Sequence, residues 1–318
     1  MIKEYAVDPG LLANWERFRY LTENFGISNG RLISRYPKRW VNLVYAALEG
    51  VSQGDLSEMQ RKRIEEKLME IDKKMLVRVC GRDDSGDWLT NSEREHADRP
   101  FTAIIGYENP RGHDQVLVYE QLDKETNSLW KSQTEITVER TAEAVSAAVA
   151  PLLRISRHVI FIDPYFEPDK DKFDNLARTV GAFLKVCLVG RFESCRLDKV
   201  WFYTRSQDIP DFECKSRDRL SQVIPAGMVL KVTRCAERTG GQGFHNRYIL
   251  TDRGRADKPD RGGVKFPWGL DEGKPGQKDV INLLQPIVVE ELWSDYCGEN
   301  PSFEMAPPFD IVGTRRIK

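Results

Sequence analysis

The residues with the clearest chemical potential are a histidine, an arginine and an aspartate in the segment FHNRYILTD, residues 244–252. His245 stands two residues before Arg247 and seven before Asp252, in a chain with only four histidines. The apolar character of the segment predicts a buried strand, on which alternate side chains face the same way. His245 and Arg247 are therefore expected to share a face that Asp252 does not. A neutral imidazole can attack phosphorus while a neighbouring cation holds the phosphate oxygens, although His-x-Arg alone on a strand is more often structural.

The elements that must position these residues change in character near residue 100. Residues 11–78 show helical spacing of apolar and aromatic side chains, and the polar run 82–100 predicts a loop or linker. From residue 101 the sequence alternates between predicted strands and helices, with 191–228 mixed and helical around 215–223. Strands are expected at 101–110 and 115–122 as a hairpin, and at 158–166, 185–190, 228–235 and 244–252; helices are expected at 137–156 and 171–183; residues 279–293 close the alternation.

This alternation predicts an α/β fold in which helices pack on a sheet. We place a mostly helical N-terminal domain at 1–98 and an α/β domain at 99–318. The length and the 40% hydrophobic content suffice for two such domains.

The motif His245-x-Arg247-x4-Asp252 resembles the HxK(x)4D signature of the phospholipase D superfamily. Two further features are similar: the strand IFIDPYF, and the glycine turn WGLDEG followed by an acidic residue before VINLL. The resemblance covers roughly residues 100–297 and implies a mixed sheet flanked by helices. Residues 1–99 match no family that we can name from their motifs.

The resemblance also implies roles for individual residues. His245 would attack phosphorus and form a phosphohistidine, Arg247 would hold the phosphate in place of the usual lysine, and Asp279 would orient the imidazole. Asp252 would be a structural brace. The family's Gly-Ser-x-Asn turn is replaced by Gly269-Leu270-Asp271, and Asp271 would repel a phosphate if it were ionised.

The mechanism of the family needs two histidines, and none of the other three histidines begins a second such motif. Either two chains pair their single motifs across a two-fold axis, or the protein is inactive. Single-motif relatives form such dimers, so we expect a homodimer with the two His245 side chains near the axis.

The expected function is therefore that of a phosphodiesterase, with nucleic acid favoured over lipid as substrate. The alternative is a non-catalytic phosphodiesterase-like adaptor that binds nucleic acid or a protein partner. A helical domain beside such a nuclease is similar to effectors of anti-phage modules, and protein partners of a defence module are expected on that analogy alone.

The composition further narrows the possible classes of protein. The 48 Lys and Arg residues balance 49 Asp and Glu residues, so the chain as a whole is not a basic nucleic-acid binder. No apolar run is long enough to span a bilayer and the N-terminus carries no apolar leader, so we expect a cytoplasmic protein without a membrane partner. The cysteines at 80, 187, 195, 214, 235 and 297 form no CxxC pair, and neither a metal site nor a cofactor is predicted.

Two weaker candidates remain open. Asp163 ends a strand before Pro164, so it either forms a turn or lies at the mouth of the site. In the N-terminal part, basic residues interleave with aromatic ones, which suits phosphate binding and base stacking as well as the charged face of an amphipathic helix. This second set comprises Arg31, Arg35, Lys38, Arg39 and Trp40.

Overall fold

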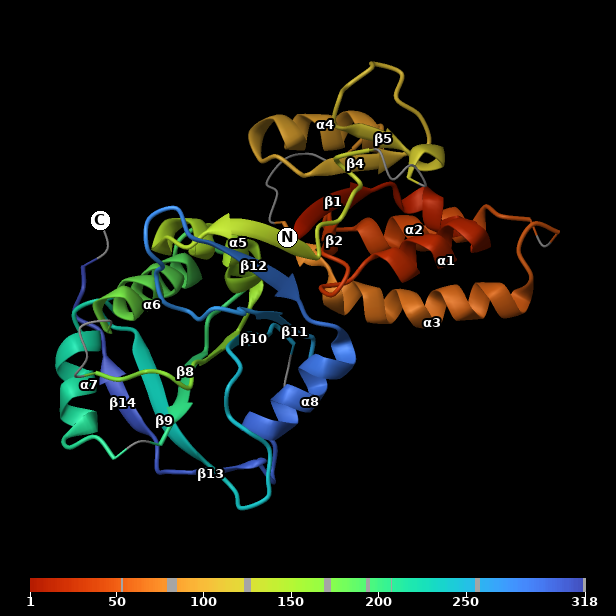
Figure 1. Ribbon diagram of the computed structural model, residues 1–318. Helices are drawn as coiled ribbons and strands as arrows, with labels where there is room; N and C mark the ends of the chain where they lie inside the picture. The colour runs from red at the N-terminus through yellow and green to blue at the C-terminus, as the bar shows by residue number, and fades with distance from the viewer. Residues whose placement is uncertain are drawn as a thin grey trace. The chain divides into compact units, whose positions relative to one another are not determined.

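The computed structural model describes residues 1–52, 54–78, 85–122, 127–168, 173–192, 195–206, 208–254 and 258–316. Its contacts divide the chain into two compact units, an N-terminal unit that holds most of residues 2–133 and a C-terminal unit that holds residues 134–191 and 195–318. Both units are α/β, and the described residues form eight α-helices and two sheets (Figure 1). The helices are α1 Trp15–Asn24, α2 Trp40–Glu49, α3 Glu58–Lys74, α4 Trp88–Asp98, α5 Ala142–Ile155, α6 Phe173–Leu188, α7 Phe212–Leu220 and α8 Pro286–Cys297.

The N-terminal unit is built on a five-stranded parallel sheet in the order β3-β2-β1-β4-β5. Its strands are β1 Lys3–Val7, β2 Arg31–Arg35, β3 Leu76–Val77, β4 Ala103–Gly106 and β5 Val116–Val118. Buried apolar side chains of β1, α1, α2 and α3 form its core, in which Tyr5, Trp40 and Leu68 are fully enclosed. The helical spacing predicted α1 to α3, but it did not predict the short strands β1 and β2 that lie among them in the sequence.

The division into units differs from the expected boundary at 98/99. β4 pairs in parallel with β1, and β5 pairs in parallel with β4, so residues 103–118 belong to the N-terminal sheet. The predicted hairpin of these two strands is wrong for the same reason. The predicted linker at 82–100 contains α4 in its described part, because Asp87 caps that helix by accepting a hydrogen bond from the Thr90 N–H.

The C-terminal unit contains a nine-stranded mixed sheet in the order β13-β9-β8-β7-β10-β11-β12-β6, with β14 also paired to β9. β7, β8 and β9 are parallel to one another, and β10, β11, β12 and β6 continue the sheet in antiparallel pairs. The strands are β6 Glu135–Glu139, β7 His158–Ile162, β8 Lys199–Arg205, β9 Val229–Glu237, β10 Tyr248–Asp252, β11 Arg261–Lys265, β12 Lys278–Leu283, β13 Phe303–Met305 and β14 Phe309–Val312.

Helices cover both faces of this sheet, which explains why β7 is apolar on both sides (Figure 1). Ile160 and Ile162 belong to the same buried cluster as Trp293 of α8. The intervening Phe161 stacks on Phe183 of α6 at 5.6 Å between ring centroids, and α5 packs beside α6. The predicted layered α/β arrangement is thus confirmed at this level.

Three local predictions in this unit are wrong. Residues 185–188, expected in a strand, continue α6, and Cys187 is buried on that helix. The expected helix at 137–156 begins only at Ala142, because residues 135–139 pair with β12 as β6. β10 begins at Tyr248, so His245 and Arg247 precede the strand instead of lying on it.

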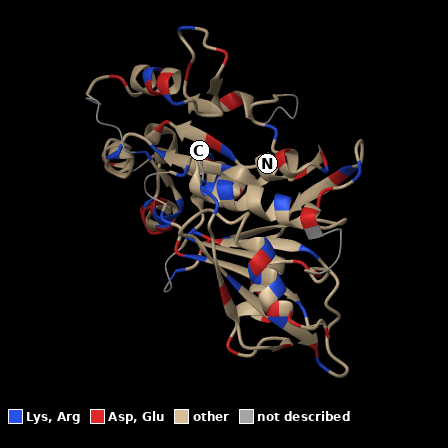
Figure 2. Cartoon of the chain, turned by 90° about the vertical axis from the view of Figure 1, so that its left-hand side faces the viewer, with Lys and Arg blue, Asp and Glu red and all other residues tan. Residues whose placement is uncertain are grey.

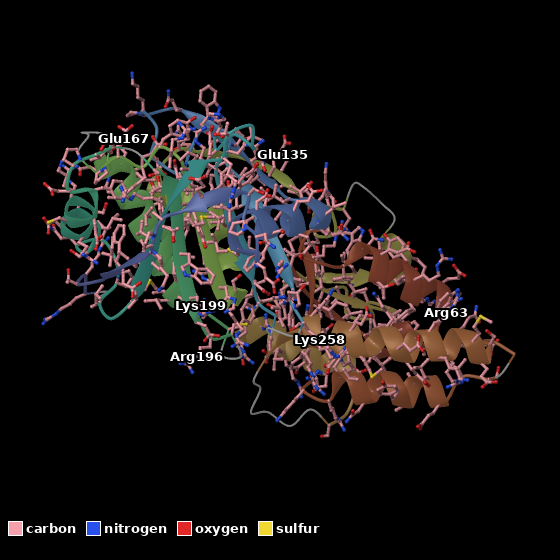
Figure 3. All side chains as sticks on the ribbon, turned by 90° about the horizontal axis from the view of Figure 1, so that it is seen from below. Arg63, Glu135, Glu167, Arg196, Lys199 and Lys258 are labelled. Carbon is pink, nitrogen blue, oxygen red and sulfur yellow. The ribbon has the colours of Figure 1, made fainter. Side chains whose placement is uncertain are left out.

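Charges of both signs are distributed over both units (Figure 2). Exposed charged residues such as Arg63, Arg196 and Lys258 lie on the outside, as Figure 3 shows. Within the described ranges, every helix is too short or too polar to cross a lipid bilayer.

Candidate functional site

The candidate site lies at one edge of the C-terminal sheet, where the pairing of the strands brings several ends together. The C-terminal ends of β7, β8 and β9 meet there with the N-terminal end of β10, because β10 is antiparallel to β7 and Tyr248 lies opposite Ile162. The end of β11 and the start of β12 lie next along the same edge. Ligands of α/β sheets commonly bind at the carboxyl ends of parallel strands.

His245 is exposed at this edge and is contacted by two charged side chains. Its side chain is 63% exposed. Arg205 Nη2, at the end of β8, lies 3.0 Å from His245 Nδ1, and Glu237 Oε1, at the end of β9, lies 3.9 Å from Nε2. A guanidinium only donates, so Nδ1 accepts this hydrogen bond and the proton of the neutral ring is on Nε2. The 3.9 Å distance is too long for a hydrogen bond, yet it places a carboxylate on the Nε2 side.

Glu237 is held where it can act on His245. Its Oε1 atom accepts a hydrogen bond from the Phe244 N–H at 2.8 Å and lies 3.2 Å from Arg205 Nη2. The Phe244 N–H and the Arg205 charge together lower the pKa of Glu237. The carboxylate is therefore ionised at neutral pH.

Arg247 and Arg205 share an aromatic neighbour. The Cζ atom of Arg247 lies 4.3 Å from the centroid of the Tyr165 ring, and that of Arg205 lies 5.6 Å from it. Tyr165 lies three residues after the end of β7 and is 46% exposed. Stacking on an aromatic ring restricts a guanidinium while leaving its outer N–H groups free to bind an anion.

Three arginines at this edge each keep a buried donor without a partner. The Nε atoms of Arg140, Arg205 and Arg247 have no hydrogen-bond partner among the described residues. A buried donor left unpaired costs about 1–3 kcal/mol, so such groups are rare in cores and call for an explanation. Guanidinium groups positioned for a ligand at the expense of stability are one such explanation.

Asp163 and Asp279 are buried carboxyl groups that hold the turn 267–271 against the site. Asp163 accepts hydrogen bonds from the Tyr165 N–H at 2.9 Å and the Leu270 N–H at 3.2 Å. Asp279 accepts from the N–H groups of Val280 and Trp268. Burial raises the pKa of both carboxyl groups, against the opposing effect of the nearby Arg247. Asp163 thus both forms a turn and lies at the candidate site, so the two roles that its sequence suggested occur together.

Gly269 and Asp271 complete this turn. Gly269 has a φ of 123°, a backbone conformation that residues other than glycine rarely adopt. Asp271 accepts a hydrogen bond from Arg140 Nη2 at 3.0 Å, and so the carboxylate expected to repel phosphate is paired. Arg140, which follows β6, was not among the predicted site residues.

Asp252 lies at the opposite end of β10 from His245. It is 5% exposed, and its Oδ1 atom accepts hydrogen bonds from the N–H groups of Gly254 at 2.8 Å and Asp260 at 3.0 Å. It therefore closes the connection between β10 and β11, in the part of that connection that the structure describes, and it does not face the imidazole.

The expected pairing of Asp279 with His245 is not found among the described residues, where Arg205 and Glu237 are the polar neighbours of the imidazole. Sequence reasoning missed Arg205, Glu237 and Tyr165. A signal was present, because Glu237 stands two residues after the predicted strand 228–235 and Tyr165 lies near the end of the predicted strand 158–166. β8 was hidden in the stretch interpreted as mixed.

The basic and aromatic residues of the N-terminal part do not form a stacking surface. Trp40 is fully buried, and its Nε1 donates to the Val7 carbonyl at 2.6 Å. Arg31 donates to the Trp130 carbonyl at 2.9 Å, and Arg35 pairs with Asp72 at 3.1 Å, so both are used in the packing of the unit. Lys38 and Arg39 are exposed between β2 and α2.

Among the described residues, no group of three or more His, Cys, Asp and Glu side chains is arranged to hold a metal ion. Cys80 lies outside the described residues. The chain matches no protein-family model and no curated protein. The arrangement at the sheet edge is therefore interpreted from its own chemistry.

Proposed function

We propose that the sheet edge around His245 is a phosphodiester-binding site and that the protein is a metal-independent phosphodiesterase, a nuclease acting through a phosphohistidine. One observation carries the proposal: an exposed imidazole lies 3.0 Å from Arg205, which shares the ring of Tyr165 with a second arginine, Arg247. A nucleophile beside cations that bind non-bridging oxygens is the arrangement that phosphoryl transfer needs.

The contacts of His245 suggest how its nucleophilic nitrogen is released. Phosphate oxygens compete with His245 Nδ1 for the Arg205 guanidinium, and their charge makes them the stronger acceptor. The lone pair of Nδ1 can then attack phosphorus. Glu237 moves closer, accepts a hydrogen bond from the Nε2–H and so orients the ring.

The reaction balances in two steps. The Nδ1–phosphorus bond forms as the bond from phosphorus to the leaving oxygen breaks, and that oxygen takes a proton from an acid. Water then attacks phosphorus as it gives a proton to the group that acted as the acid, and the phosphorus–nitrogen bond breaks, which restores both the neutral imidazole and the acid. We assign the acid to the protonated His245 of a second copy of the chain, which requires a homodimer.

The test is cleavage of bis-p-nitrophenyl phosphate and of labelled DNA and RNA oligomers in the presence of EDTA. His245→Ala is expected to lower cleavage by more than about 10³-fold and Arg247→Ala by about 10²–10³-fold. His113→Ala is the matched control, because this histidine is 52% exposed and belongs to the N-terminal unit. Loss of activity with EDTA, or full activity of His245→Ala, contradicts the mechanism.

A second candidate function is that of a non-catalytic adaptor that binds nucleic acid or a protein partner. It is favoured by the hydrogen bond from Arg205 that occupies the His245 Nδ1 lone pair, and by Asp271 in place of a neutral polar residue. Trapping distinguishes the two functions: the enzyme forms a phosphohistidine on His245 that survives alkaline denaturation. The adaptor binds oligomers without forming that adduct.

A further inference from the structure

Trp268 is exposed in a manner that packing of the chain does not explain. All seven tryptophans lie in the described part of the chain, and Trp268 is the only one that is largely exposed, at 68%. An indole is a large apolar surface that usually gains stability from burial. Beside a candidate site, an exposed indole offers a flat apolar surface on which the ring of a ligand can stack.

The backbone of Trp268 is fixed at the site by the site residues themselves. The Pro267 carbonyl accepts a hydrogen bond from Arg247 Nη1 at 3.4 Å, and the Trp268 N–H donates to Asp279. Two residues later the Leu270 N–H donates to Asp163, and the Leu270 side chain is buried. The indole is thus carried on a turn that is tied on both sides to the phosphate-binding arrangement.

Tyr165 supplies a second aromatic surface at the same edge. Its N–H is held by Asp163, the carboxyl group that also holds Leu270 of the Trp268 turn. Its ring is contacted by both Arg247 and Arg205. Arginines and exposed aromatic side chains therefore lie at one sheet edge, where Asp163 holds the backbone of Tyr165 and Leu270 and Asp279 holds that of Trp268.

This combination matches one class of substrate. Single-stranded nucleic acids are bound by cations that follow the phosphates and by aromatic rings on which unpaired bases stack, each base contributing about 1–3 kcal/mol. A duplex hides the faces of its bases, and a lipid headgroup has no flat ring. We propose that the substrate is single-stranded nucleic acid and that Trp268 and Tyr165 stack its bases beside the scissile phosphate. This inference rests on the proposed phosphodiester site.

The test measures binding by fluorescence anisotropy with His245→Ala, which removes the nucleophile. The probes are a labelled 12-nucleotide thymidylate, an abasic phosphodiester oligomer of the same length, and a duplex. The thymidylate is expected to bind at least about tenfold more tightly than either of the others. Adding Trp268→Ala should remove most of the preference over the abasic oligomer, whereas adding Trp268→Phe should retain it.

The matched control is Ile287→Ala in the same background, because Ile287 is an apolar residue of α8 that is 69% exposed. It should leave all three affinities unchanged. Equal binding of thymidylate and abasic oligomers, absence of binding to all three probes, or a preference that survives Trp268→Ala overturns the inference.

Its failure is distinguishable from that of the proposed reaction. If the wild-type protein cleaves abasic and ordinary oligomers with equal kcat/KM, the proposed reaction is supported and the proposed base stacking is contradicted. If binding depends on bases and on Trp268 but no phosphodiester is cleaved, the base stacking is supported and the reaction is contradicted.

Discussion

Asp163 and Asp279 show how single residues set the site. Each is buried, yet each accepts two backbone hydrogen bonds that position the segments carrying Tyr165 and Trp268. Burial makes the ionised carboxylate costly, and this cost rises with pH. Fixing the geometry of this edge therefore lowers the stability of the folded protein.

Asp279→Asn tests this cost. The folded-state pKa of Asp279 is raised above the unfolded value of about 3.9, so wild-type stability is reduced as pH rises from that value through the raised pKa. The amide has no charge to lose. The free energy of unfolding of Asp279→Asn minus that of the wild type should therefore become more positive between pH 4 and pH 7. Urea unfolding at several pH values measures this difference, and a difference that is flat or falls with pH contradicts the assignment.

At the scale of secondary-structure elements, the residues of the motif His245-x-Arg247-x4-Asp252 lie at the two ends of one strand. His245 and Arg247 precede β10 at the site, whereas Asp252 ends β10 at the far edge of the sheet, opposite His158. The spacing in the motif is therefore explained by the length of a strand that crosses the sheet.

Asp252→Ala should destabilise the chain without altering the site. It removes the acceptor of the Gly254 and Asp260 N–H groups, at a cost of about 1–3 kcal/mol in the free energy of unfolding. Asp252→Asn keeps one acceptor oxygen and should cost less. Chemical unfolding measures both variants. A folded Asp252→Ala protein that had lost phosphodiester cleavage would instead show that Asp252 acts in the reaction.

A buried ion pair joins elements of the N-terminal unit. Arg78, next to β3, pairs with Glu4 of β1 at 2.8 Å and with Glu95 of α4 at 3.2 Å, and it also donates to the Arg99 carbonyl. Arg78 and Glu95 are almost fully buried. The pair connects segments that lie far apart in the sequence.

Arg78→Ala should remove the cation that pairs with Glu4 and with Glu95, of which Glu95 keeps its pair with Arg99 at 2.7 Å, and lower the free energy of unfolding by about 3–5 kcal/mol. Lys67→Ala is the matched control, since Lys67 pairs with Glu70 at 2.6 Å and both side chains are more than half exposed. Its loss should cost less than about 1 kcal/mol. Urea unfolding of the full chain compares the two variants, and equal effects would show that burial of the Arg78 pair is not what matters.

At the scale of the whole molecule, one motif supplies one histidine, and the proposed reaction uses two. Subunits carrying His245→Ala, mixed with wild-type subunits under exchanging conditions, should therefore lower the cleavage rate as the square of the wild-type fraction. Sedimentation should show a dimer at every mixing ratio. A linear loss of activity would mean that each chain acts alone, and a monomer would exclude the shared site.

The sequence by itself determined the layered α/β class and the apolar β7, and it singled out His245 and Arg247 as candidates, because periodicity and spacing are local properties. Only the tertiary structure decided that Arg205 and Glu237 contact His245, that Asp279 holds Trp268 instead of the imidazole, and that β4 and β5 belong to the N-terminal sheet. The physical reason is strand order. Hydrogen bonding between strands distant in the sequence chooses which strand ends meet, and a pattern within one segment carries no record of that choice.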